Sequence, residues 1–461
     1  MTDLTLAVNE ILDRRPGYLT AEQYYNGTAE EVFTSAATRR ALRHTGGQFR
    51  LNFAATTVNA VNDRLEITSV STMSDEAGQY LDRVWASNEL ELEVAQVHKN
   101  ALVYGDAYLI ALPDEDSLQV YYNSPKTTVV IYDEENPRLK RFAAKMWEVS
   151  ADSGKCKTRV NLYYPDRIEK YISVGNRLPH SPKDADFVPY VDEFTDADGI
   201  MPNPLGLIPV FHFRTERPQG KPEHLRAYGP QDAINKLVVT QMAANDFHGF
   251  PQRFALIDAG SNEVTDFDDD SQESSIEANT PGEMMFLRGV KEVGQFKSAD
   301  PNTFIDPMRV NIRAMATITA TPLHYFEPTG NVPSGEALRV AEAPLVKKCK
   351  SRQLSFGATW REVFSFILDA AGYREDVQVH WRAVETFDTK EAWEIARVKA
   401  QVGLPFAQNM AEMGYDTGLV TRWEQQKAAE ASTQAGAAAG ATPVQPADTT
   451  AVEDGSGLEA A

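Results

Sequence analysis

The chain has 461 residues, of which 42% are hydrophobic and 10% aromatic, so it can bury two or three cores. Its 66 acidic residues outnumber the 45 basic ones and give a net charge of −21, which excludes a surface that grips duplex DNA everywhere and leaves only local contacts. No apolar run reaches the roughly 18 residues of a membrane span, and the first residues lack the basic flank and apolar core of a signal peptide. We therefore expect no membrane contact and a protein that stays in the cytoplasm in which it is made.

The sequence lacks the motifs of common catalytic and metal sites. The two cysteines, Cys156 and Cys349, lie far apart and without Cys-x-x-Cys spacing, which predicts plain thiols instead of a disulfide or a zinc site. No phosphate-binding G-x-x-x-x-G-K-[ST] loop, His-Glu-x-x-His pair or nucleophile elbow occurs. We therefore expect no enzymatic activity, no cofactor and no metal.

The N-terminal part of the chain predicts helices followed by strands. Apolar residues at three-and-four spacing predict helices within 21–33, 50–65 and 77–105, the last of which ends at Gly105. From 106 to 174 the apolar period changes to two, with Pro, Asn, Asp and Gly between the runs. This pattern predicts an antiparallel β meander.

A Pro- and Asp-rich stretch leads from the strands back to helices. Residues 176–214 predict long connections over a sheet, with short strands that end at Phe213. Gly229 and Pro230 then suit the N-cap and first position of a helix that Pro251 ends. The apolar side of this helix carries Ile234, Leu237 and Val238.

An acidic, turn-rich insert spans about 258–297, with one or two short strands expected near Met284 to Arg288. Its run "DFDDDSQE" (266–273) has the carboxylates that hold Mg²⁺ in nucleases. No apolar strand frame surrounds the run to position those carboxylates. A solvated loop is therefore the favoured interpretation.

A second helix begins at Asp306 and Pro307 and ends before Pro322. The two helices have large apolar faces that a bundle of one subunit would not fully cover, which favours a symmetric, head-to-tail contact between subunits. We expect this contact to use Ile234, Leu237, Val238, Ile312 and Met315.

The loop "TPLHYFEPTGNVPS" (321–334) is longer than the roughly 2–8 residues of common helix connections, which indicates a function. Its prolines and glycine flank three consecutive ring-bearing side chains, His324, Tyr325 and Phe326. Exposing these rings is unfavourable unless something covers them. Either neighbouring subunits or DNA cover them, or they anchor the loop on their own subunit.

A third, longer helix runs from its N-cap Ser334 to about residue 371, with a kink or a restart at Pro344. Its apolar stripe lies opposite a basic side that includes Arg339, Lys347 and Lys350. By periodicity alone, that basic side is an ordinary solvated surface. Two further helices are predicted at 389–403 and 404–414, and the tail beyond them has the composition of a disordered segment.

Several stretches, in a fixed order, resemble the portal proteins of tailed bacteriophages, in particular those of long-tailed phages of Gram-positive and actinobacterial hosts. "YYNG" (24–27) is similar to an early portal signature, and "YGDAYLIA" (104–111) resembles the Gly-[Asp/Glu]-Ala-Tyr strand. "NPLGLIPVFHF" (203–213) resembles the Asn-Pro-Leu-Gly-x-[Ile/Val]-Pro-Val element. "TPLHYF" with "SGEALRVAEAPLVKK" resembles the junction of tunnel loop and long helix.

This resemblance implies an α+β portal fold with an α/β wing, a two-helix stem, an α/β clip, a long kinked helix and a helical crown. The expected parts are the wing at 1–228, stem helix 1 at 229–250, the clip at 251–302, stem helix 2 at 303–320, the tunnel loop at 321–334, the long helix, wing return strand and crown helices at 335–430, and a disordered acidic tail at 431–461.

The resemblance also implies a function and partners. The chain would form a ring, usually a dodecamer, at one vertex of the virion capsid after assembly in the host cytoplasm, with a channel for DNA packaging and ejection. Expected partners are double-stranded DNA, the terminase large subunit, the major capsid protein and scaffold, and head-completion or adaptor proteins. The alternatives are a capsid-associated adaptor or scaffold without a channel, and a metal-dependent phage nuclease that uses the acidic insert.

Within that expectation, the tunnel loop projects into the channel. His324, Tyr325 and Phe326 would pack between subunits while the tip at Gly330 and Asn331 meets the DNA. Arg339, Lys347 and Lys350 would face the channel and touch passing phosphates. The acidic excess would then let DNA slide without being held.

Overall fold

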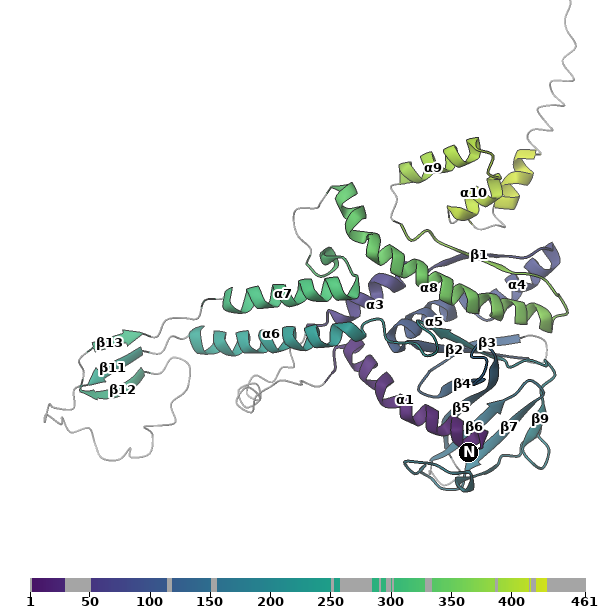
Figure 1. The fold of residues 1–461 in the computed structure, drawn as a ribbon, viewed down its shortest axis with the longest axis horizontal. Helices are drawn as coiled ribbons and strands as arrows, with labels where there is room; N and C mark the ends of the chain where they lie inside the picture. The colour runs from purple at the N-terminus through teal and green to yellow at the C-terminus, as the bar shows by residue number, and fades with distance from the viewer. Residues whose placement is uncertain are drawn as a thin grey trace, which may run out of the picture. The chain divides into compact units, whose positions relative to one another are not determined.

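The structure is a computed structural model of the full chain, and it divides into two compact units, residues 1–386 and 387–461 (Figure 1). Mixed helix and sheet confirm the expected α+β class. The described residues are 2–29, 51–113, 118–150, 156–249, 253–257, 284–289, 292–295, 300, 302–327, 334–385, 389–413, 415 and 420–428. The predicted tail at 431–461 and the loop tip with Gly330 and Asn331 lie outside them.

The chain begins with a long helix, α1 (Asp3–Asn26), which starts well before the helix predicted at 21–33. The hydroxyl of Thr2 caps it by accepting a hydrogen bond of 3.3 Å from the backbone N–H of Thr5. Gly27, at φ 70°, ends it in the left-handed conformation that favours glycine. Helices α3 (Ala54–Asn62), α4 (Asp75–Ser87) and α5 (Leu90–Tyr104) follow in the first unit.

The antiparallel strands that the alternation predicts are present, but they form two sheets. One has the order β10 (Val210–Arg214), β2 (Asp106–Pro113), β3 (Leu118–Asn123). The other has the order β4 (Thr128–Tyr132), β5 (Lys140–Ser150), β6 (Cys156–Tyr163), β7 (Arg167–Ser173), β8 (Phe187–Pro189), and β9 (Ile200–Pro202) also pairs with β7.

The largest core of the first unit lies where α8 (Gly335–Ala370) meets α4, α5 and the β10-β2-β3 sheet. Trp360 is fully buried there, with its ring centroid 4.8 Å from that of Phe213. Full burial of such a side chain contributes about 1.5–3 kcal/mol. Figure 1 shows α8 as one continuous helix that bends in its first third, so the chain does not restart at Pro344.

Two strands distant in sequence complete this part of the fold. β1 (Ile67–Ser71) pairs antiparallel with β14 (Gln378–Trp381), with Val70 opposite Val379. The long helix α8 therefore returns the chain to the N-terminal region. The strand β14 lies within 335–430, where a return strand is expected from the sequence after the long helix.

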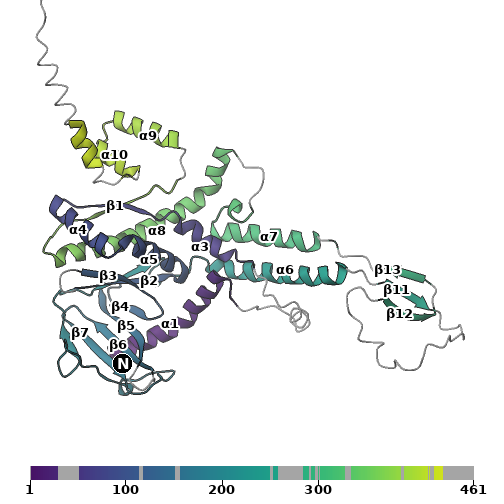
Figure 2. The same cartoon turned by 180° about the vertical axis from the view of Figure 1, so that it is seen from behind.

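The paired helices α6 (Tyr228–Gly249) and α7 (Asn302–Thr319) lie side by side in both views (Figures 1 and 2). The sequence placed the start of α7 at Asp306, but the helix begins a turn earlier and contains Pro307. At this start, Asp300 accepts a hydrogen bond of 2.9 Å from the N–H of Asn302 through its carboxylate, which satisfies one of the N–H groups that a helix start leaves without a partner in the helix.

The chain between α6 and α7 forms a small sheet. Its central strand β11 (Arg253–Ile257) pairs parallel with β12 (Met284–Gly289) and antiparallel with β13 (Glu292–Gln295). The sequence predicted one or two strands here, near Met284, and the implied α/β clip predicted helix as well. Up to residue 295, the described part of this insert is strand only.

The second unit contains α9 (Thr389–Gln401) and α10 (Phe406–Glu412), which pack together. The side-chain amide of Asn409 donates a hydrogen bond of 2.7 Å to the carbonyl of Ala396. Both helices lie where the sequence predicts them, and residues 420–428 add a further helical segment.

Candidate functional site

Helices α3, α6, α7 and α8 meet at the base of the loop 321–334, which we call the junction. Its apolar centre is formed by residues of α3, α6 and α7 together with Phe326, which follows the short 3₁₀ turn Leu323–Tyr325. The buried members of this cluster are Ala54, Ala227, Ile234, Val238, Ile312, Met315, Ala316 and Phe326.

The subunit contact predicted from the sequence assumes that a single subunit leaves the apolar faces of α6 and α7 partly uncovered. The junction shows that most of the residues named for the subunit contact are already buried. Ile234, Val238, Ile312 and Met315 are at most 8% exposed within a single chain, because α6 and α7 cover each other and pack on the segment that contains Ala54. Only Leu237, of the five residues named, is half-buried and so partly available to a neighbour. Among the side chains of α6 and α7 that the structure describes, the exposed large apolar ones are different: Met242, Val310 and Ile318.

The rings of the loop also lie against their own subunit. Phe326 is 6% exposed, with its centroid 6.0 Å from that of Phe53 in an edge-to-face arrangement. Tyr325 packs against the same cluster and is half-buried. Within the single chain both rings therefore pack on their own subunit, as the anchoring alternative predicts.

A polar network fastens this loop base to two other elements. Arg64 donates from Nη2 to the hydroxyl of Tyr325 at 2.9 Å and pairs with Glu342 of α8 at 3.0 Å. Its Nη1 donates to the carbonyl of Val384 at 3.1 Å. Burial would lower the pKa of Arg64, but the Tyr325 and Glu342 oxygens raise it overall. His324 lies 3.6 Å from the same Glu342 carboxylate.

A second network joins α8 to the segment before α6 and to the end of α7. Glu223 pairs with Lys348 at 3.1 Å and with Arg352 at 2.9 Å. Lys348 also donates to the carbonyl of Thr319, the last residue of α7. Burial alone would raise the pKa of Glu223, but the two cations hold it below its usual value. Because the carboxylate is only 5% exposed, its ionisation depends on these partners.

The predicted basic face of α8 is exposed at Arg339, Lys347 and Lys350. Lys350 forms an ion pair with Glu385, in the segment that follows β14. The charge of Lys350 is therefore partly neutralised within the chain. The cations that hold the junction together, Lys348 and Arg352, are neighbours of the predicted ones in sequence but point inward.

Sequence reasoning missed Arg64, Glu223, Lys348 and Arg352. A signal was present for two of them, because Lys348 and Arg352 are spaced i, i+4 beside the apolar stripe of α8. Charges bordering an apolar stripe indicate buried ion pairs. Their partner Glu223 lies in a segment without periodicity. Arg64 lies at the end of a predicted helix, and no local pattern points to its partner Glu342.

No group of three or more potential metal ligands occurs among the described residues, which leave out the acidic run 266–273. In the same part of the chain, no helix is both long and apolar enough to cross a bilayer. Cys349 is buried in α8, and burial raises the pKa of its thiol to about 11, so it is unreactive as a nucleophile.

Comparison with known proteins gives a family match over most of the chain. Residues 7–404 match the family described as "Phage portal protein, SPP1 Gp6-like". The chain is 25% identical over 306 residues to the portal protein of Mycobacterium phage D29, covering 63% of this chain and 58% of that protein. It is 24% identical over 384 residues to the portal protein of Mycobacterium phage L5, covering 77% and 74%. The match thus spans less than two thirds of the D29 protein.

Solved structures similar to the chain come from gene transfer agent (GTA) particles. A chain of the neck of a native GTA particle, computed with C12 symmetry, has a TM-score of 0.42, and one of the neck of an empty particle, computed with C6 symmetry, has a TM-score of 0.44. Both are 14% identical to this chain, and each comparison covers 84% of this chain and 95% of the other.

Proposed function

This chain belongs to the phage portal proteins of the SPP1 Gp6-like family, and we propose that it forms a ring with a central channel at one vertex of the capsid. The family match over residues 7–404 carries this proposal. The order of elements supports it. The small sheet β11–β13 lies between α6 and α7 in the sequence, and α7 is followed by the loop 321–334 and then by α8.

In this proposal the ring, most simply a dodecamer, passes double-stranded DNA during packaging and ejection. Its outer contacts are with the terminase large subunit, the major capsid protein and scaffold, and head-completion proteins. The role is structural and needs no catalytic group or cofactor. Assembly takes place in the host cytoplasm and ends in the virion.

We place the subunit contact of α6 and α7 on the residues that the single chain leaves uncovered. Val310 is 63% exposed and Ile318 42% in α7, Met242 is 39% exposed in α6, and Leu237 of α6 is half-buried. Exposed apolar side chains on two packed helices favour a contact with another protein surface. Repetition of that contact around a closed ring would bury them in every subunit.

The channel surface in this proposal includes the exposed basic side chains Arg339, Lys347 and Lys350 of α8, and the loop tip with Gly330 and Asn331. A few cations per subunit give weak and repeated contacts with phosphates, and the acidic excess of the chain opposes tight binding. The anchored Tyr325 and Phe326 would then fix the base from which the tip extends.

Electron microscopy of the purified full-length chain tests the proposal. Rings with a central hole, and DNA-filled particles that depend on the chain, are the expected results. Assemblies without a hole would instead identify an adaptor or scaffold protein. Compact monomers that cleave DNA in the presence of Mg²⁺ would identify a nuclease and overturn the proposal.

A further inference from the structure

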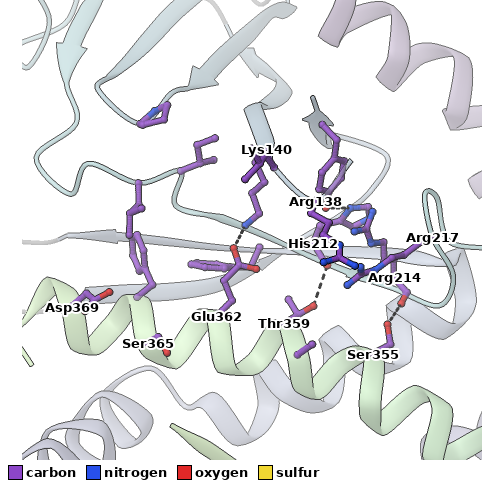
Figure 3. Close-up of a pocket in the computed structure, with 18 residues that line it drawn as sticks. Arg138, Lys140, His212, Arg214, Arg217, Ser355, Thr359, Glu362, Ser365 and Asp369 are labelled. Atoms are coloured by element: carbon purple, nitrogen blue, oxygen red, sulfur yellow. Dashed lines mark hydrogen bonds and ion pairs between the residues drawn. The ribbon is translucent and has the colours of Figure 1, made fainter. Parts of the chain in front are cut away.

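A cavity of about 730 Å³ lies between strand β10, the start of β5 and the C-terminal half of α8 (Figure 3). Its position is distinct from the junction, and none of the proposed portal surfaces uses it. The volume is in the range of pockets that take a ligand of many atoms, instead of a single ion.

The cavity is unusually basic for so acidic a chain. Four cationic side chains line it, against the two carboxylates of Glu362 and Asp369. Lys140 is committed to one of them, since it pairs with Glu362 and also donates to the carbonyl of Val210 at 2.8 Å. The three remaining cations are Arg138, Arg214 and Arg217.

These three arginines have no carboxylate partner within the described part of the chain, and Figure 3 shows them gathered at one end of the cavity, away from Asp369. Arg214 is only 8% exposed. One of its nitrogens donates to the carbonyl of Pro218 at 2.7 Å, and its guanidinium lies 4.5 Å from the ring centre of Tyr132. A buried guanidinium held in place in this way, without an anion, is a strong site for one.

The neighbouring His212 adds no positive charge. Its Nε2 lies 2.8 Å from Asp106 in a fully buried pair, and burial lowers its pKa. The anion-attracting groups at this end are therefore the arginines, two of which are exposed at the rim.

The free edge of β10 adds backbone donors. Among the described strands, β10 pairs only with β2, and the carbonyl of Pro209 accepts from that strand. Because the backbone groups of a strand alternate in direction, those of Val210, His212 and Arg214 face the other side. Each of the three carbonyls accepts a hydrogen bond from a side chain. Lys140 donates to Val210, Thr359 donates to His212 at 3.3 Å, and Ser355 donates to Arg214 at 2.8 Å. Of these residues His212 and Arg214 line the cavity, and their N–H groups have no acceptor among the described residues.

The remaining lining favours a peptide over inorganic phosphate. Apolar side chains from several elements make up the rest of the wall, and a free phosphate would leave that surface uncovered. An extended peptide offers carbonyl acceptors for the edge N–H groups, an apolar side chain for the wall and a carboxylate for Arg214. The apolar wall consists of Leu139, Pro165, Leu207, Ile208, Phe211, Ala358 and Phe366.

We propose that this cavity binds an acidic peptide segment of a partner protein, with a carboxylate on Arg214 and the rim arginines and an apolar side chain against the exposed Leu139 and Leu207. The inference does not depend on the ring or the channel.

Fluorescence anisotropy of the full-length chain with a labelled peptide, Ala-Leu-Asp-Glu-Phe-Ala, tests the proposal. We expect saturable binding that is lost when Asn and Gln replace the two acids. The double variant Arg138→Glu/Arg217→Glu should weaken binding roughly tenfold, since it reverses both exposed charges at the rim. A matched variant, Arg177→Glu/Arg374→Glu, changes the net charge equally at exposed sites outside the cavity and should bind as the unchanged chain does.

Arg214→Gln should remove binding, and its circular dichroism shows whether it folds. If it does not fold, the rim variant decides the question. Three results would overturn the proposal: no saturable binding, equal binding by the rim and control variants, or complete displacement of the peptide by millimolar inorganic phosphate, which would identify a simple anion site.

Discussion

The guanidinium of Arg64 donates a hydrogen bond of 2.9 Å to the hydroxyl of Tyr325, although 260 residues separate them in the chain. The same guanidinium pairs with Glu342, so one side chain ties the loop 321–334 to α8 and to the turn that follows α3. Side-chain exposure is 12% for Arg64 and 10% for Glu342. Little solvent is therefore present to replace a missing partner.

Arg64→Ala should lower the free energy of unfolding by about 3 kcal/mol, because it leaves the carboxylate of Glu342 buried without its main partner. Urea denaturation followed by tryptophan fluorescence measures the change. Arg382→Ala is the matched control, because its pair with Glu66 is more than half exposed on both sides. We expect that variant to lose less than about 1 kcal/mol. Equal losses would contradict a structural role for the Arg64 network.

The loop should separate into an anchor and a tip. Phe326→Ala should cost about 3–5 kcal/mol of stability, since it empties a buried site beside Phe53. Replacing residues 328–331 with a Gly/Ser segment of equal length should leave stability and ring size unchanged. Particles built from the replaced tip should nevertheless fail to package or retain a full genome. Full-length DNA in those particles would show that the tip is only a connection.

Exposed residues of α7 should affect ring formation without affecting the stability of the single chain, whereas buried residues of the junction should affect both. Val310→Asp should prevent ring closure without a change in unfolding temperature, because Val310 contacts solvent in the single chain. Ile234→Asp places a charge in the core of the junction and should lower the unfolding temperature as well. Electron microscopy and thermal unfolding of both variants distinguish the two effects. Intact rings from Val310→Asp would refute the proposed contact.

Changing Arg339, Lys347 and Lys350 together to Gln should leave ring assembly intact and lower the amount or rate of DNA packaged. The deficit should grow at low salt, where contacts between lysine or arginine and phosphate are strongest. Packaging assays at several salt concentrations measure it. Normal packaging at every concentration would mean that the three residues are ordinary solvated surface.

Stability should fall with acid between pH 6.5 and 4 through His98. Trp360 donates to its Nε2 at 2.8 Å, so Nδ1 carries the proton and donates to the carbonyl of Leu65 at 3.1 Å. Burial lowers the pKa of this imidazole from 6.5 to about 4. As pH falls, the unfolded chain binds a proton that the folded chain does not, so stability is lost by up to about 1.4 kcal/mol per pH unit.

His98→Gln removes this titration and should reduce the slope of the unfolding free energy against pH, measured by urea denaturation from pH 7 to 4. A residual slope should remain, because burial also lowers the pKa of His224 to about 4. His180→Gln, at an exposed position, should keep the slope of the unchanged chain. An unchanged slope in His98→Gln would show that the imidazole already titrates normally when folded.

Local sequence patterns determined most of the elements, because the signals are local. The change of apolar period from about four to two located the strands after Gly105, and proline and glycine marked the ends of α6 and α7. The start of α7 was misplaced because Asp306 and Pro307 resemble a helix start, while the helix begins at Asn302. The resemblance of motifs in order identified the family that the comparison then showed.

Only the tertiary structure decided which apolar and charged residues face inward. Ile234 and Val310 have similar side chains on neighbouring helices, yet one is buried and the other is 63% exposed. Lys347 and Lys348 are adjacent, and only Lys348 reaches the buried carboxylate of Glu223. Periodicity defines the faces of a helix, but burial depends on segments hundreds of residues away that pack on those faces, and a single sequence carries no local record of that packing.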